Sequence, residues 1–103
     1  MYMQRISIYP TPEKVGEARA LLVERAKLRQ EAGLRLALSE LVAGAHAPQF
    51  TVSVLFNDLA AFEASRKRDQ ADADFQKFVA KLASLVRKPM GFDLMEVLAP
   101  MPG

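Results

Sequence analysis

The sequence predicts an α+β domain in which helices cover one face of a four-stranded antiparallel sheet. Segments with apolar residues at every second position, typical of strands, alternate along the chain with segments whose apolar residues recur every three or four positions, typical of helices. The 103 residues suffice for one hydrophobic core, so we expect a single domain over residues 1–103. Half of the residues are hydrophobic and a quarter are charged, which excludes a disordered or low-complexity chain.

The first two elements are predicted to be a strand and a long helix. In residues 3–9, Gln4, Ile6 and Ile8 fall on one side of an extended chain and the residues between them on the other, which is typical of a strand. Pro10 ends this strand, and Thr11 is expected to cap the helix with its hydroxyl while Pro12 occupies the first helical position. Apolar residues spaced by three and four continue the helix: Val15, Ala18, Leu22 and Ala26. Gly33 suits the left-handed conformation that ends helices.

Two strands are predicted next. Leucines alternate with other residues over 34–39, and the alternation breaks at residues 40–42, where a bulge would account for the change of phase. Residues 43–48, AGAHAP, form a loop. Residues 50–56 alternate Phe and Val with other residues and are the clearest strand of the chain.

A broken helix and a last strand complete the pattern. Asn57 and Asp58 are good caps for a short helix over residues 59–68. A break at residues 69–72 leads to a second helical piece with one apolar stripe: Phe75, Phe78, Val79, Leu82, Leu85 and Val86. A proline and a glycine end this helix, and residues 92–98 form a strand before a Pro-rich end. The order is that of a ferredoxin-like βαββαβ domain.

The sheet face opposite the helices is also predicted to carry apolar residues: Met3, Tyr9, Ala37, Leu41, Leu55, Met95 and Val97. A chain of this length has enough helix for one face only. We therefore expect two copies to pack sheet against sheet in a symmetric homodimer. The alternative is a monomer with a mildly apolar second sheet face.

With these elements in place, the chain resembles the dimeric α/β-barrel superfamily, in its branch of small antibiotic-biosynthesis-monooxygenase-like and NIPSNAP-like proteins. The resemblance is carried by residues 12–26, by residues 56–89 (FNDLAAFEASRKRDQADADFQKFVAKLASLVRKP) and by the closing LMEVLAP at 94–100. It implies a barrel made of two sheets from two copies. Members of this superfamily include cofactor-independent oxygenases of polyketide aromatics, haem-degrading enzymes, small isomerases, decarboxylase-like enzymes and ligand-sensing domains, and the fold does not select among them.

Composition excludes several kinds of site. The chain has no cysteine and one histidine, which excludes disulfides, thiolate nucleophiles, iron–sulfur clusters and a polyhistidine metal site, so no metal or cofactor is predicted. Nucleic-acid binding is not expected, because the net charge is only +2 and an RNA-stacking strand would need aromatics where Thr51 and Ser53 stand. No segment has the length and hydrophobicity of a membrane span or export signal, so we expect a cytoplasmic protein.

Glu40, Glu96 and His46 are the candidate catalytic residues. Each glutamate shares its strand phase with apolar neighbours, and desolvation would raise the pKa of such a carboxyl and suit it to act as a general base. The alternative is that a phase slip turns Glu40 outward, or that either glutamate pairs with Arg5 or Arg35 across the dimer. His46 is the only imidazole, but it lies in a loop where histidines are usually inert.

The candidate ligand-binding residues are Tyr9, Phe56, Asn57 and Phe62. Asn57 has an alternative role as a helix cap, and two further polar groups near strand ends are Ser39 and Arg66, the latter expected to face solvent. One hypothesis is a homodimer that binds a small apolar or aromatic molecule in a pocket between the sheet and the helices of each copy. In this hypothesis it acts as a cofactor-independent monooxygenase or proton-transfer catalyst. The other is a non-catalytic ligand-binding or accessory protein. Similar oxygenases use Trp, Tyr and Asn around the substrate, and this chain departs from them in having no tryptophan.

Overall fold

The predicted order of elements is confirmed by the computed structural model, which describes residues 1–99 and 102. The strands are β1 (Tyr2–Ile8), β2 (Arg35–Glu40), β3 (Phe50–Phe56) and β4 (Gly91–Glu96). The helices are α1 (Val15–Glu31), α2 (Leu59–Ala71) and α3 (Ala73–Ala83), with a short 3-10 turn (Pro12–Lys14) before α1. Pro100 of the closing LMEVLAP segment, together with Met101 and Gly103 of the Pro-rich end, lies outside the described residues.

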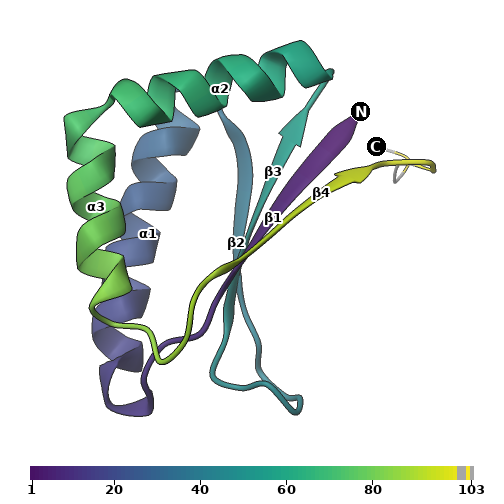
Figure 1. Cartoon of the computed structure of the whole chain (residues 1–103). Coiled ribbons are helices and arrows are strands. Elements are labelled where there is room, and N and C mark those ends of the chain that lie inside the picture. The colour runs from purple at the N-terminus through teal and green to yellow at the C-terminus, as the bar shows by residue number, and fades with distance from the viewer. Residues whose placement is uncertain (100–101, 103) are drawn as a thin grey trace.

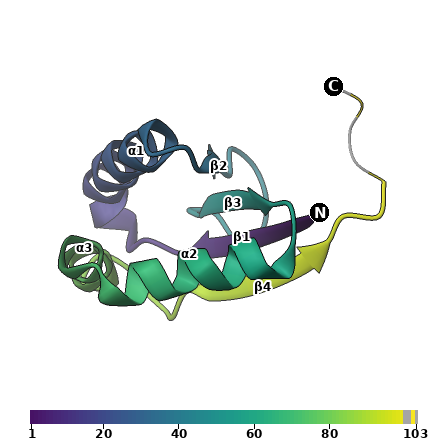
Figure 2. The ribbon, with the colours of Figure 1, turned by 90° about the horizontal axis from the view of Figure 1, so that it is seen from above.

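The four strands form one antiparallel sheet in the order β2-β3-β1-β4. This order confirms the ferredoxin-like fold class. Figure 1 shows α1 and α3 on the same side of the sheet, with α2 crossing towards them from the end of β3. Figure 2 shows the same arrangement from above. One sheet face is therefore covered by helices, and the other has no helix from the described part of this chain.

The strand register decides which residues share a face. Directly opposite residues of antiparallel strands point to the same side. On the helix side, one row across the sheet is Leu36, Val54, Gln4 and Leu94, and the next row is Leu38, Val52, Ile6 and Phe92. The strand phases expected from the sequence are thus present.

The hydrophobic core lies at one end of the helix-covered face. Ile8 and Phe50 are opposite each other in β1 and β3, and each is 1% exposed. Residues of α1 and of the segment around the end of α3 pack onto them: Ala18, Leu22, Leu82 and Leu85. This tight packing is confined to one end of the helix-covered face and does not extend to the other end.

The bulge expected at residues 40–42 is absent. β2 keeps its register with β3 through Glu40, which lies opposite Phe50. The backbone N–H of Leu41 then donates to the carbonyl of Gln49 at 2.9 Å. The break in alternation therefore reflects the end of the strand and not an inserted residue. Gly33 adopts the expected left-handed conformation, with φ of 95°.

Of the three expected capping side chains, Asp58 caps its helix, whereas Thr11 and Asn57 do not. The Thr11 hydroxyl makes no capping hydrogen bond, because the chain enters a tight 3-10 turn in which the Thr11 carbonyl accepts from the Lys14 N–H at 2.8 Å. At α2 the cap is Asp58 and not Asn57: the Asp58 carboxylate accepts from the Ala61 N–H at 2.7 Å. The other expectation, that Asn57 and Asp58 together mark this helix start, is confirmed.

The break in the long helical segment is narrower than expected. Asp72 alone separates α2 from α3. Its carboxylate accepts hydrogen bonds from the N–H groups of Asp74 and Phe75, at 2.9 and 3.2 Å. One aspartate thus ends one helix and caps the next, which sets the turn that brings α3 beside α1.

Candidate functional site

A cavity of about 470 Å³ lies between the sheet and the helices, beyond the end occupied by the core. Its floor is aliphatic and comes from three strands: Ile6, Leu36, Val52 and Val54. Sites for small organic molecules generally have volumes of a few hundred cubic ångströms and predominantly apolar linings. The size and floor of this cavity suit one such molecule.

Aromatic rings form much of the cavity wall. Four of the six phenylalanines of the chain line it: Phe62, Phe75, Phe78 and Phe92. Phe75 and Phe78 lie on α3 with their ring centres 5.9 Å apart. Phe92 lies on β4 at the edge of the sheet and is 63% exposed, so the cavity is open to solvent on this side.

One polar side chain, Gln4, lies within the aliphatic floor. It occupies β1, flanked by Val54 on one side and Leu94 on the other. Among the described residues its amide makes no hydrogen bond, although it lines the cavity. An amide offers two donor hydrogens and one acceptor oxygen. Gln4 is therefore a free polar contact in the middle of an apolar surface.

Three arginines and one aspartate add charge to the cavity lining: Arg25, Arg29, Arg66 and Asp69. Arg29 donates to both carboxylate oxygens of Asp69, at 3.0 and 3.1 Å. Arg25 lies over the Phe78 ring at 5.0 Å. Arg66, by contrast, has no ion pair or hydrogen bond with the part of the chain that the structure describes. The lining thus carries a net positive charge.

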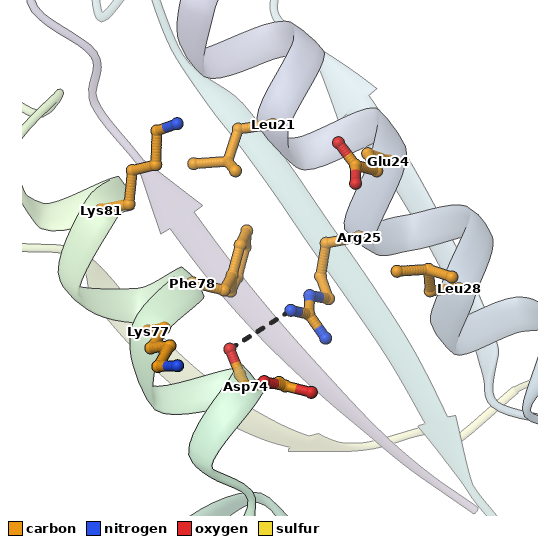
Figure 3. A pocket seen from close by; sticks show the side chains of 8 residues that line it. All are labelled: Leu21, Glu24, Arg25, Leu28, Asp74, Lys77, Phe78 and Lys81. Atoms are coloured by element: carbon orange, nitrogen blue, oxygen red, sulfur yellow. Dashed lines mark hydrogen bonds between the residues drawn. The ribbon is translucent and has the colours of Figure 1, made fainter.

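A second, shallower depression of about 330 Å³ runs between α1 and α3 on the outside of the helix layer. Figure 3 shows Arg25 reaching across it to the backbone carbonyl of Asp74, a hydrogen bond of 3.3 Å. Charged side chains surround it: Glu24, Asp74, Lys77 and Lys81. Arg25 is shared between this groove and the cavity, and its contacts tie α1 to α3.

Glu40 does not have the raised pKa expected from the sequence. It lies on the helix side of β2, as its strand phase predicted, but Arg19 of α1 donates to both of its carboxylate oxygens at 2.8 Å. These hydrogen bonds from Arg19 hold the pKa of Glu40 below its ordinary value. Its partner within the described chain is therefore Arg19. Pairing of either glutamate with Arg5 or Arg35 across a dimer stays a prediction.

The three candidate catalytic residues lie apart from one another. Glu96 is the last residue of β4, opposite Tyr2, at the other edge and the other end of the sheet from Glu40. His46 is exposed in the loop between β2 and β3, where its backbone carbonyl accepts from Arg87 at 3.2 Å. Glu40, Glu96 and His46 are all absent from the cavity lining. A catalytic role for any of them stays a prediction.

Of the four candidate ligand-binding residues, Phe62 lines the cavity. Phe56 is buried behind it, with the two ring centres 5.6 Å apart in an edge-to-face arrangement. Asn57 is exposed before α2. Tyr9 lies elsewhere, with the Lys88 ammonium 4.0 Å above its ring. Of the other polar groups, Arg66 lines the cavity, whereas Ser39 lies on the opposite sheet face.

Sequence reasoning missed several polar residues that line the cavity. Gln4 was visible as the polar member of the strand phase that contains Ile6 and Ile8. Arg29 and Asp69 carried no such signal, because 40 positions separate them and only the fold makes them a pair. Within residues 1–99 and 102, no three His, Cys, Asp or Glu side chains are grouped so as to hold a metal ion. The helices described are too short or too polar to span a membrane.

Comparisons with known proteins find similar folds among solved structures. An uncharacterised NIPSNAP domain protein from Burkholderia xenovorans is 17% identical, with both chains covered completely and a TM-score of 0.81. An antibiotic biosynthesis monooxygenase is 19% identical, with 96% of this chain and 100% of the other covered and a TM-score of 0.73. A NIPSNAP family protein from Agrobacterium tumefaciens is 15% identical over 91% and 82%, with a TM-score of 0.73. No protein-family profile and no curated protein matches the chain. At these identities the likeness establishes a shared fold.

Proposed function

We propose that this chain, whose fold is that of NIPSNAP domain and antibiotic biosynthesis monooxygenase structures, binds a small, largely apolar or aromatic molecule between its sheet and its helices. The observation that carries the proposal is the cavity of about 470 Å³ with its aliphatic floor and four phenylalanine side chains. Burial of an apolar molecule there is favourable at about 25 cal/mol per Å² of apolar surface. The opening beside Phe92 provides a route of entry.

The functional unit is a homodimer whose two sheets pack through the faces that carry no helices. Leu55, Met3 and Met95 support this, because they form an adjacent row on that face and all three are half-buried. The next row combines Ser53 with the Arg5–Asp93 ion pair, and the row beyond it contains Ser7 and Gly91, whose small size allows a second sheet to approach closely. Such an arrangement would leave both cavities on the outer, helix-covered sides.

A second candidate function is a cofactor-independent monooxygenase, because one structure of similar fold is that of an antibiotic biosynthesis monooxygenase. In that reaction the carbanion of an acidic substrate reduces oxygen directly, and the protein contributes positioning and desolvation. The cavity supports this candidate because its apolar floor carries one hydrogen-bonding side chain, Gln4. The alternative remains a non-catalytic binding or accessory protein with the same cavity.

Calorimetric titration with 1-naphthol tests the proposal. Val52→Phe places a ring in the floor of the cavity, and we expect it to weaken 1-naphthol binding more than tenfold while the protein stays folded. Val23→Phe is the matched control on the exposed side of α1 and should bind as the wild type does. Unchanged binding by Val52→Phe, or no binding by the wild type at millimolar probe, would contradict the proposal.

Oxygen uptake separates the two candidates. If the chain is an oxygenase, wild-type protein should consume oxygen with at least one member of a panel of hydroxylated aromatics, and Val52→Phe should not. Binding without oxygen uptake across the panel would leave the non-catalytic function.

A further inference from the structure

We infer that the molecule taken by the cavity is an amphiphilic organic anion, with an apolar body on the strand floor, an oxyanion such as a carboxylate against Arg66, and an oxygen atom bonded by Gln4. This inference rests on the proposed function and names the class of ligand. Its basis is the charge and hydrogen-bonding state of the polar residues that line the cavity.

The charges around the cavity do not cancel. The single carboxylate of the lining, Asp69, has both of its oxygens occupied by Arg29. Arg25 is held by the Phe78 ring and by the carbonyl of Asp74. Arg66 remains, and its guanidinium makes no ion pair within the described chain. A guanidinium beside a low-dielectric cavity favours an anion, and it can bind a carboxylate with two parallel hydrogen bonds.

The position of Arg66 on α2 directs it to the cavity. Phe62, Arg66 and Gln70 are spaced by four residues, so they lie along one face of the helix, and all three line the cavity. Phe62 is inside, packed against Phe56, whereas Arg66 is exposed at the rim. An aromatic body in contact with Phe62 would thus have its anionic group within reach of the Arg66 side chain, whose head remains near water.

Gln4 adds a requirement at the floor. A ligand that excludes water from this surface would leave the Gln4 amide without a hydrogen bond unless the ligand supplies a partner. An unpaired polar group of this kind costs about 1–3 kcal/mol, which disfavours ligands without an oxygen atom at that place. Gln4 therefore selects for a polar atom in the body of the ligand.

The charges of the lining disfavour a cationic ligand. Its counter-charge would have to be Asp69, whose negative charge is already balanced by the bidentate contact with Arg29. The remaining arginines would repel the ligand. The cavity is therefore matched to negative charge.

Three probes of one shape test the inference: 2-naphthoate, the neutral 2-naphthamide, and naphthalene, each titrated calorimetrically into the full chain at low salt. We expect 2-naphthoate to bind about tenfold more tightly than 2-naphthamide, with the difference falling as salt is raised. Arg66→Gln should abolish this preference and keep the affinity for 2-naphthamide. Arg68→Gln, on the same helix but outside the lining, should leave the preference intact. A fourth probe, 6-hydroxy-2-naphthoate, carries an oxygen atom on the ring system, and Gln4→Leu should weaken its binding while leaving that of naphthalene unchanged.

The outcomes are distinguishable. If naphthalene and 2-naphthamide bind as tightly as 2-naphthoate, the cavity binds apolar molecules but the charge inference is overturned. If none of the probes binds, the proposed function itself fails. If Arg66→Gln keeps the full preference for 2-naphthoate, the assignment of the oxyanion to Arg66 is wrong.

Discussion

Arg29, near the end of α1, and Asp69, near the end of α2, form a two-point ion pair with N–O distances of 3.0 and 3.1 Å. Their side chains are 21% and 27% exposed. The Arg29 guanidinium also lies 4.9 Å from the centre of the Phe75 ring, on α3. One arginine therefore joins all three helices at the edge of the cavity, where no tightly packed core holds them together.

Removal of either partner should destabilise the protein. We expect Arg29→Gln and Asp69→Asn each to lower the free energy of unfolding by about 1–2 kcal/mol, because each leaves a partly buried charge without its partner. A double-mutant cycle from urea unfolding should then give a coupling energy of about 1 kcal/mol. The Arg19–Glu40 pair is the control. Its side chains are 48% and 38% exposed, so it should show weaker coupling. Strictly additive effects of the two Arg29–Asp69 substitutions would contradict this role.

The Arg19–Glu40 pair should make the folded protein less stable at low pH than at neutral pH. The pKa of Glu40 is lower in the folded chain than in the unfolded one, chiefly because Arg19 donates hydrogen bonds to its carboxylate. At pH values near these two pKa values the folded state therefore binds fewer protons at Glu40 than the unfolded state does. The stabilisation of the folded state by the ionised Glu40 carboxylate is complete above the unfolded pKa of about 4.3. It is lost as the pH falls through the lower pKa of the folded chain.

Glu40→Gln should accordingly be less stable than the wild type at pH 7, with a difference that shrinks as the pH is lowered from 5 to 3. Thermal unfolding at a series of pH values in low salt measures it. In an Arg19→Gln background the Glu40→Gln substitution should have no such pH-dependent effect. A difference that stays constant down to pH 3 would show that the ion pair is not its cause.

Asp72 should make a measurable contribution through its cap on α3. Its carboxylate accepts from two backbone N–H groups that otherwise lack partners in the first turn. We expect Asp72→Ala to lower the free energy of unfolding by about 1 kcal/mol. Asp72→Asn and Asp72→Ser can still cap the helix and should keep most of the wild-type stability. Urea denaturation measures both. Equal stability of the Ala and Ser variants would argue against the cap.

The strand phases were predictable because packing and register both follow a period of two residues. Ile8 and Phe50 are in the core for this reason, and Glu40 lies on the helix side as its neighbours indicated. Its pKa was not predictable, because that depends on Arg19, which approaches from a helix 21 positions away. The alternation of residues along a strand thus identifies the sheet face on which a side chain lies, but not the side chain with which it pairs.

A pocket between the sheet and the helices was expected from the sequence, but its extent and its lining residues were not predictable, for a related reason. An apolar residue in a core and one lining a cavity give the same pattern, and Val52 and Phe50 differ only in what the helices place above them. Phe92 lies on the helix side of the sheet in the same row as Ile6 and Val52, yet it is 63% exposed at the cavity opening. The position of the site depends on how far the core extends along the sheet, which local spacing does not encode.

The uncovered sheet face supports a last prediction, on assembly. If two sheets pack together, Leu55 would be buried near Met3 of its own chain and against the partner sheet. Leu55→Lys would place a charge in that apolar contact, and the cost of burying it should separate the copies.

Light scattering at micromolar concentration should therefore give the wild type twice the chain mass of 11.4 kDa, and Leu55→Lys a value near one chain mass. Ala20→Lys adds the same charge to the exposed side of α1 and should leave the dimer intact. Circular dichroism establishes that the variants remain folded. A wild-type mass of one chain would refute the sheet-to-sheet dimer, whereas a dimer that survives Leu55→Lys would mean that the copies associate through another surface.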